Sequence, residues 1–199
     1  MKPLTYALLA KKVYSVPPQI GTADSSCRAI VETTEDGIAL VFRGSDDTDS
    51  WLADLDAETV NVHGLGELHN GFCQAWKLNK DMLLNNAADV VAGHSLGAAL
   101  AILHGAIMCL NGKPPKAVFA FEPPRVSVDE TLASLFKAHG VQLFLYRNGL
   151  DLVTDVPVAL PTLNWQHPAP LIHIGVASLP IPNVQDHMIA AVVEAVKTV

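Results

Sequence analysis

A serine set between two glycines, in the stretch Gly93-His94-Ser95-Leu96-Gly97, is the part of this chain best suited to chemistry. It follows an apolar run at 88–92 and precedes a run of small apolar residues at 98–110. Glycines two positions either side of a serine allow a sharp strand-to-helix turn that holds the hydroxyl in a strained, exposed position. The N-terminus of the following helix favours an anion beside it. The stretch predicts a nucleophile, and the alternative is an ordinary turn.

A nucleophilic serine needs a histidine to take its proton. Of the histidines that follow the serine, His187 comes after the last predicted strand and just before the terminal helix, from where its ring can reach back over the sheet. His167 is the main alternative. The others are less well placed, because His104 lies inside a helix, His139 precedes a strand and His173 lies within one. His187 is therefore the predicted general base.

The histidine in turn needs a carboxylate that selects its tautomer and stabilises its charged form. When the chain order is serine, acid, histidine, the acid lies on a loop after a later strand. Asp151 follows the predicted strand that ends at Tyr146, and Asp155 is the alternative. We expect Asp151 to be the acid.

An oxyanion hole needs the backbone N–H of the residue after the nucleophile and a second N–H from a loop after an earlier strand. Leu96 supplies the first. The segment Phe42-Arg43-Gly44-Ser45 ends another predicted strand, which makes Ser45 the expected second donor. The alternative for this segment is a plain strand-ending turn.

The elements that must hold these groups alternate between strand and helix. This order predicts a mostly parallel sheet with helices on both faces, and a site at the carboxyl ends of the strands. Residues 46–58 are either a short amphipathic helix or a solvated loop. The periodicity predicts helices over 4–14, 70–84, 98–110, 129–138 and 185–199, and strands over 28–33, 38–43, 88–92, 116–121, 141–146 and 171–176.

Residues 156–184 contain no Asp, Glu, Lys or Arg but six prolines, which predicts an ordered apolar excursion around the last strand. Leu160, Trp165 and Leu171 from this stretch, together with Trp51 and Leu52, are expected to line an acyl-binding wall. Plain core and loop packing is the alternative for these side chains.

Composition restricts the broad class. A chain of 199 residues, 50% hydrophobic and 17% charged, can form one domain over 1–199. A net charge of -7 argues against a nucleic-acid partner. The three cysteines are widely spaced and show no metal-ligand pattern, so we expect reduced core residues and neither a metal nor an organic cofactor.

Two apolar segments bear on the compartment. The N-terminal one is too short and too soon charged for a signal peptide, which favours a cytoplasmic protein. The uncharged run at 90–112 has the length of a membrane span, but Gly93, His94, Ser95 and other polar or small residues interrupt it. We therefore expect a buried strand and helix there and no transmembrane segment. The oligomeric state stays open.

Several segments together resemble the class 3 (fungal-type triacylglycerol) lipase family. They are Phe42-Arg43-Gly44-Ser45 with Trp51-Leu52, His69-Asn70-Gly71-Phe72, the serine motif continued by Ala98-Ala99-Leu100, Pro124-Arg125-Val126, and residues 148–157. The resemblance implies an α/β-hydrolase fold and hydrolysis of carboxylic esters. It matches Ser95, Asp151 and His187 to the family's triad and Ser45 with Leu96 to its oxyanion residues.

The resemblance also places the family's lid over residues 46–55, with Trp51 at the position of the lid's tryptophan. As part of the expected acyl-binding wall, Trp51 and Leu52 are the predicted substrate contacts. This chain departs from the family pattern at Ala98, at Glu122-Pro123, where a small residue and glycine are common, and at Thr154. None of these departures removes a catalytic group.

The expected function is hydrolysis of a small-molecule or lipid ester through an acyl-enzyme, with contact to a lipid interface as an option. A non-catalytic binding protein on the same fold is one alternative. An acyltransferase, or an enzyme acting on thioesters or peptides with the same nucleophile, is another.

Overall fold

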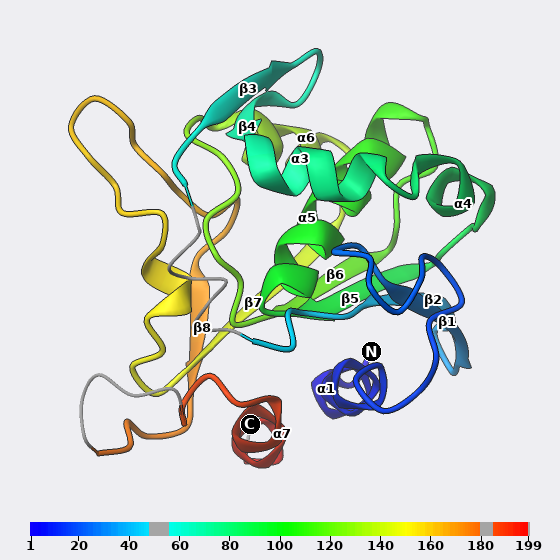
Figure 1. Ribbon diagram of the computed structural model, residues 1–199, viewed down its shortest axis with the longest axis vertical. Coiled ribbons are helices and arrows are strands. Elements are labelled where there is room, and N and C mark those ends of the chain that lie inside the picture. Colours follow the sequence, from blue (N-terminus) through cyan, green and yellow to red (C-terminus); the bar gives the residue numbers. More distant parts are fainter. Residues whose placement is uncertain (48–55, 180–184, 199) are drawn as a thin grey trace.

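A six-stranded sheet in the order β1-β2-β5-β6-β7-β8 forms the centre of the molecule (Figure 1). The structure is a computed structural model that describes residues 1–47, 56–179 and 185–198. β1 and β2 form an antiparallel hairpin, and the remaining neighbours are all parallel, as the alternating pattern predicts. The strands are β1 (Ala29–Thr34), β2 (Gly37–Phe42), β5 (Val90–His94), β6 (Ala117–Phe121), β7 (Gln142–Asn148) and β8 (Leu171–Ile174).

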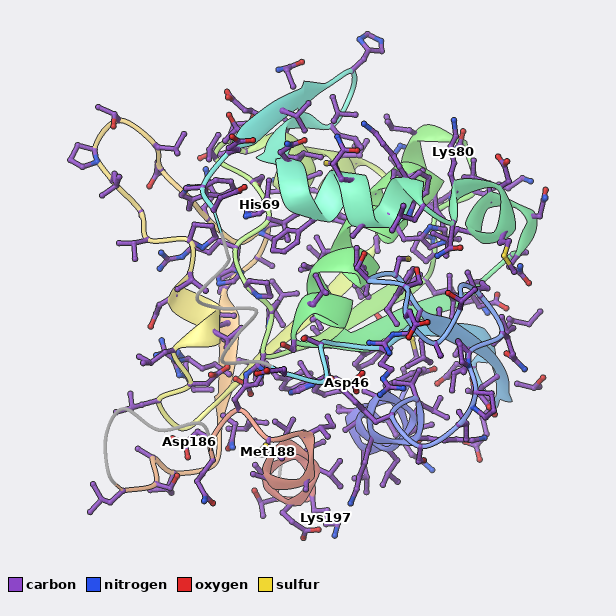
Figure 2. The ribbon with its side chains drawn as sticks, viewed as in Figure 1. Asp46, His69, Lys80, Asp186, Met188 and Lys197 are labelled. Carbon is purple, nitrogen blue, oxygen red and sulfur yellow. The ribbon has the colours of Figure 1, made fainter. Side chains whose placement is uncertain are left out.

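Helices cover both faces of this sheet, as expected (Figure 1). α1 (Pro3–Lys12) and α7 (Ile189–Val196) pack on one face. α3 (Asn70–Lys77), α5 (Leu96–Leu110) and α6 (Thr131–Ala138) pack on the other. The labelled side chains of His69 and Lys197 mark these opposite sides (Figure 2). α5 runs directly out of β5, so the serine motif lies at the carboxyl edge of the sheet.

The strands are apolar on both sides because each side faces a separate core. In β6, Phe119 and Phe121 face the layer of α1 and α7, while Val118 and Ala120 face α5. This is the period of two that a strand imposes, and burial on both faces produces the continuous apolar runs seen in the sequence.

Three segments differ from the sequence prediction. The predicted helix over 70–84 is divided into α3 and α4 (Lys80–Asn85), because the backbone of Asn79 leaves the helical conformation, with φ -124° and ψ 25°. The Asn79 side chain donates hydrogen bonds to the Cys27 carbonyl, at 2.7 Å, and to Ser25 Oγ, at 3.2 Å. A small hairpin, β3 (Thr59–Val62) with β4 (Gly66–His69), was not predicted.

The third difference is the terminal helix, which begins at Ile189 instead of 185 because the residues before it form the turn that carries His187. A single turn of 3-10 helix, η1 (Val153–Asp155), follows β7. Most of the 46–58 segment, including Trp51 and Leu52, lies outside the described residues. No helix among those described is long and apolar enough to cross a bilayer, since the uncharged run at 90–112 is divided between β5 and α5.

Aromatic stacking fastens α1 to the sheet, and we expect its loss to be costly. Phe119 is fully buried and stacks between Tyr6, at 4.3 Å between ring centroids, and Phe144, at 4.6 Å. Phe119→Ala should lower the free energy of unfolding by about 3–5 kcal/mol, measured by urea denaturation. Leu8→Ala, on the exposed side of α1, is the control and should change it by less than about 1 kcal/mol. Equal effects of the two substitutions would contradict this packing.

Candidate active site

Ser95 occupies the sharp turn between β5 and α5 that the glycine spacing predicts. Its backbone has φ 58° and ψ -130°, a strained combination for a residue with a side chain. A Cβ on Gly93 would overlap the carbonyl oxygen of Gly97, and one on Gly97 would overlap that of Phe42. The Ser95 N–H donates to the Phe121 carbonyl at 2.9 Å, which ties the turn to the end of β6. Both glycines are therefore required by packing.

Contrary to the exposed position expected from the motif, the Ser95 hydroxyl is fully buried, and none of the described residues forms a hydrogen bond with it. It lies at the N-terminus of α5, whose first residue is Leu96. The first N–H groups of a helix have no intrahelical acceptor, so the Leu96 N–H can serve an oxyanion. The hydroxyl is therefore placed where a negative charge beside it would be stabilised.

The end of β2 lies against this turn. A Cβ placed on Gly44 would be 3.1 Å from the Ser95 Cβ, which shows how closely the two segments approach. Ser45, the predicted second oxyanion residue, follows directly. Its hydroxyl donates to the Asp47 carbonyl at 3.0 Å, so it is used within its own loop. The predicted role of Ser45 in an oxyanion hole would therefore be filled by its backbone N–H and not by its hydroxyl.

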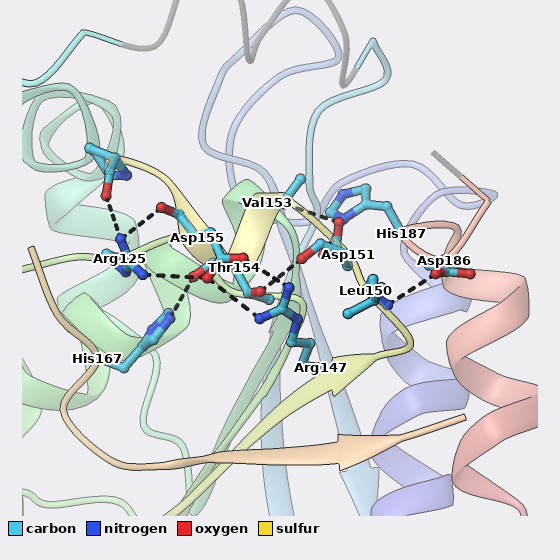
Figure 3. A network of polar contacts seen from close by, with 11 residues as sticks. Arg125, Arg147, Leu150, Asp151, Val153, Thr154, Asp155, His167, Asp186 and His187 are labelled. Atoms are coloured by element: carbon cyan, nitrogen blue, oxygen red, sulfur yellow. Dashed lines mark hydrogen bonds and ion pairs between the residues drawn. The ribbon is translucent and has the colours of Figure 1, made fainter. Parts of the chain in front are cut away.

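The structure brings Asp151 and His187 together. His187 Nδ1 lies 2.9 Å from Asp151 Oδ2, and both side chains are almost completely buried (Figure 3). The Val153 N–H donates to Asp151 Oδ1 at 3.1 Å. Burial alone would raise the pKa of Asp151, but the neighbouring Glu122 carboxyl, His187 and the Val153 N–H lower it below its ordinary value. Asp151 is thus a carboxylate, and the proton on His187 lies on Nδ1.

With Nδ1 as the donor, His187 Nε2 is the nitrogen that can accept a proton. This atom is buried and, like the Ser95 hydroxyl, has no hydrogen-bond partner within the part of the chain that the structure describes. The ring of His94, the residue before the serine, lies 4.8 Å from the His187 ring between centroids. His187 is therefore packed directly beside the turn that carries Ser95.

His94 also holds the backbone of His187. Its Nε2–H donates to the His187 carbonyl at 2.8 Å, and its Nδ1 accepts the Tyr14 hydroxyl at 2.8 Å. Burial and the neighbouring His187 lower the pKa of His94 to about 3, so the ring is neutral near pH 7. Burial raises the pKa of Tyr14. Neither residue was singled out from the sequence, although the position of His94 inside the motif was a signal.

The alternative acid and base have other partners. Asp155 pairs with Arg147, at 2.8 Å, and with Arg125, at 3.4 Å (Figure 3). His167 Nε2 lies 2.9 Å from the Thr154 carbonyl. These contacts hold the loop after β7 in place. Of the two candidate acids, Asp151 is the one whose carboxylate is bonded to a histidine.

A third tie joins the two loops that carry the acid and the base. Asp186 accepts the Leu150 N–H at 3.0 Å (Figure 3). Its backbone carbonyl accepts the Asn148 side-chain amide at 2.9 Å. Residues immediately before Asp151 and immediately before His187 are thus bonded to each other. Sequence reasoning missed Asp186, although it adjoins the predicted base.

Glu122 also lies at this site. The sequence analysis noted it only as a departure from the family pattern and did not predict that it would be a site residue. Among the described residues, Glu122, Asp151 and His187 form the single group of three donor residues close enough to hold a metal, with the ligand atoms within 4.8 Å of one another. Burial and the charge of Asp151 raise the pKa of Glu122 well above its usual range. A neutral acid, and a ring nitrogen already bonded to a carboxylate, make a poor ligand set for a cation.

The expected acyl-binding wall needs a correction. Trp165 is buried and packs against His69, with ring centroids 5.4 Å apart, so it is a core residue. Leu160 is exposed. Trp51 and Leu52 lie outside the described residues, and the wall proposed from them stays a prediction.

Comparison with known proteins agrees with this geometry. A model of the family "Lipase (class 3)" matches residues 39–160. The secreted mono- and diacylglycerol lipase A of Penicillium cyclopium is 32% identical over 161 residues, which are 74% of this chain and 51% of that protein. Its counterpart from Penicillium camembertii matches equally. The chain thus spans about half the length of these curated relatives.

Solved structures share the fold. Lipase II from Rhizopus niveus has a TM-score of 0.62 at 22% identity, covering 79% of this chain and 64% of that one. The mono- and diacylglycerol lipase from Aspergillus oryzae has a TM-score of 0.61 at 22% identity, covering 90% and 79%. These likenesses establish the α/β-hydrolase fold. The family match over residues 39–160, more than half of the chain, shows that this protein belongs to the class 3 lipase family.

Proposed function

We propose that this protein is a serine hydrolase of carboxylic esters, with lipid esters of the acylglycerol type as its substrates. The observation that carries the proposal is the buried Asp151–His187 pair packed beside the strained turn of Ser95. Membership of the class 3 lipase family supports the reaction class. The names of the relatives, mono- and diacylglycerol lipases, support the substrate class.

In the first half of the proposed reaction, His187 Nε2 takes the proton of the Ser95 hydroxyl as its oxygen attacks the ester carbonyl. Asp151 stabilises the imidazolium through Nδ1–H, a bond already formed in the free protein. The negative charge that develops on the carbonyl oxygen is stabilised by the N–H groups of Leu96 and Ser45. His187 then protonates the leaving alcohol, and an acyl-Ser95 ester remains.

In the second half, His187 takes a proton from a water molecule as its oxygen attacks the acyl carbonyl. The bond between the acyl carbon and Ser95 Oγ then breaks, His187 returns the proton to Ser95 Oγ, and the carboxylic acid is released. The chain's own side chains supply every proton transfer in this scheme.

Apolar side chains near the pair support an apolar substrate. Leu150 and Leu152, on either side of Asp151, are 43% and 45% exposed. Met188, next to His187, is 55% exposed (Figure 2). Val176 and Leu179, in the segment between β8 and His187, are more exposed still. Apolar side chains gathered near one site mark a surface that contacts ligand or lipid.

Ser95→Ala is the decisive test of catalysis. Hydrolysis of p-nitrophenyl butyrate should fall by about a million-fold in kcat, because the nucleophile is lost. Ser134→Ala, at an exposed position of α6, is the matched control and should keep full activity. A Ser95→Ala protein as active as the unmodified one would refute the proposal. A wild-type protein that neither turns over nor reacts with a fluorophosphonate would favour a binding role.

Replacing each candidate acid separates the two aspartates. Asp151→Asn should reduce kcat by about ten-thousand-fold, because the wrong histidine tautomer is then favoured. Asp155→Asn removes a partner of Arg125 and Arg147 and should lower thermal stability, with kcat within about tenfold of the wild type. Steady-state kinetics and a thermal melt on both variants make the comparison. The reverse order of kcat values would identify Asp155 as the acid.

A further inference from the structure

Glu122 lies at a position where a glutamate is costly. It follows β6 with φ 53°, and Ser95 is the only other non-glycine residue with positive φ in the ranges that the structure describes. Its N–H donates to the Tyr146 carbonyl at 2.9 Å, which holds this backbone conformation in place. A side chain with this φ costs about 1–3 kcal/mol that glycine would not. A buried glutamate at such a position needs a compensating role.

The side chain of Glu122 reaches the acid of the candidate triad. It is fully buried, and its Oε1 accepts the Asn148 N–H at 2.6 Å, at the end of β7. Its carboxyl lies beside the Asp151 carboxyl, and both are close to the His187 ring, with the donor atoms of the three residues within 4.8 Å. Glu122, Asp151 and His187 therefore share one buried site.

Two carboxyl groups this close and this buried do not both ionise. Asp151 is the carboxyl that ionises more readily, because its oxygens accept hydrogen bonds from His187 and from the Val153 N–H, which stabilise the negative charge. Glu122 has the Asn148 N–H, and the guanidinium of Arg147 is directed to Asp155 instead. The proton therefore belongs on Glu122, in keeping with its raised pKa.

We propose that Glu122 is a positioning residue for catalysis: a carboxylic acid, neutral at working pH, that donates a hydrogen bond to the Asp151 carboxylate and holds it against His187 Nδ1. This inference rests on the proposed ester hydrolysis for its catalytic meaning. The alternative is an ionised Glu122 that adds a second negative charge beside His187. The protonated and the ionised forms of Glu122 predict different effects when the residue is replaced by a neutral side chain of the same shape.

Glu122→Gln is that isostere, because its amide oxygen can accept the Asn148 N–H while its NH₂ donates to Asp151. As the pH rises above about 4.3, an unfolded Glu ionises, whereas Glu122 in the folded chain keeps its proton. The wild type thus loses stability with rising pH, up to the raised folded pKa, and Glu122→Gln lacks this loss. The variant should melt at least about 3 °C above the wild type at pH 8, and the difference should vanish near pH 4.

The control for this melt is Glu35→Gln, the same chemical change at an exposed turn, which should give no pH-dependent difference in melting temperature. A Glu122→Gln protein less stable than the wild type at pH 8 would overturn the proposal. If the variant does not fold, the infrared spectrum of the wild type at pH 7 decides. A band of a protonated carboxylic acid supports the proposal, and its absence refutes it.

Kinetics test the positioning role. Glu122→Gln should keep kcat within about threefold and leave the acid limb of the kcat/KM profile in place. Glu122→Gly accepts the positive φ but lacks the donor, so kcat should fall by at least about tenfold with little change in KM. An acid limb moved down by about one pH unit in Glu122→Gln would show an ionised Glu122. Wild-type kcat in Glu122→Gly would exclude positioning.

The two hypotheses fail separately. If the wild type hydrolyses no ester faster than Ser95→Ala, the proposed function is wrong, while the melting and infrared results still decide whether Glu122 carries the proton. If the wild type is an esterase, but the acid limb shifts in Glu122→Gln or kcat is unchanged in Glu122→Gly, only the inference on Glu122 is wrong.

Discussion

The buried hydrogen bond between Asp151 and His187 is the interaction on which the rest of the site depends. It joins two loops that follow different strands, and it spans 36 positions of the chain. Without it, the buried His187 ring would lose the acceptor of its Nδ1–H, and the buried Asp151 carboxylate would keep the Val153 N–H but lose the donor to its Oδ2. An incompletely paired buried charge is strongly destabilising. The sheet, the turns and the surrounding polar groups can all be understood as the means of keeping this pair formed.

The parallel sheet does most of this work. Because β5, β6 and β7 run the same way, Ser95, Glu122 and Asn148 end or follow their strands at the same edge. Backbone hydrogen bonds from Ser95 to Phe121 and from Glu122 to Tyr146 continue the ladder one step beyond the strands. The loops that leave this edge therefore start from fixed positions, which is what a site accurate to a fraction of an ångström requires.

Polar ties then hold the loops themselves. His94 bonds the His187 carbonyl, and Asp186 bonds the loop before Asp151. The pKa values of two neighbouring carboxyl groups of the site are shifted in opposite directions: that of Asp151 is lowered and that of Glu122 is raised. Opposite displacement of two neighbouring carboxyls assigns one charge and one proton to the pair. Such a network rigidifies a site when each of its members is satisfied.

The amino-acid sequence by itself determined the parallel sheet, the helices on both faces and the turn at Ser95, because these follow from local periodicity and from glycines that no larger residue can replace. It also ranked Asp151 above Asp155, and His187 above His167, from their places after strands. Only the tertiary structure decided that Arg125 and Arg147 engage Asp155, that Trp165 is core, and that Glu122 and Tyr14 join the site. Those outcomes depend on contacts between residues far apart in the chain, and neither spacing nor composition records such contacts.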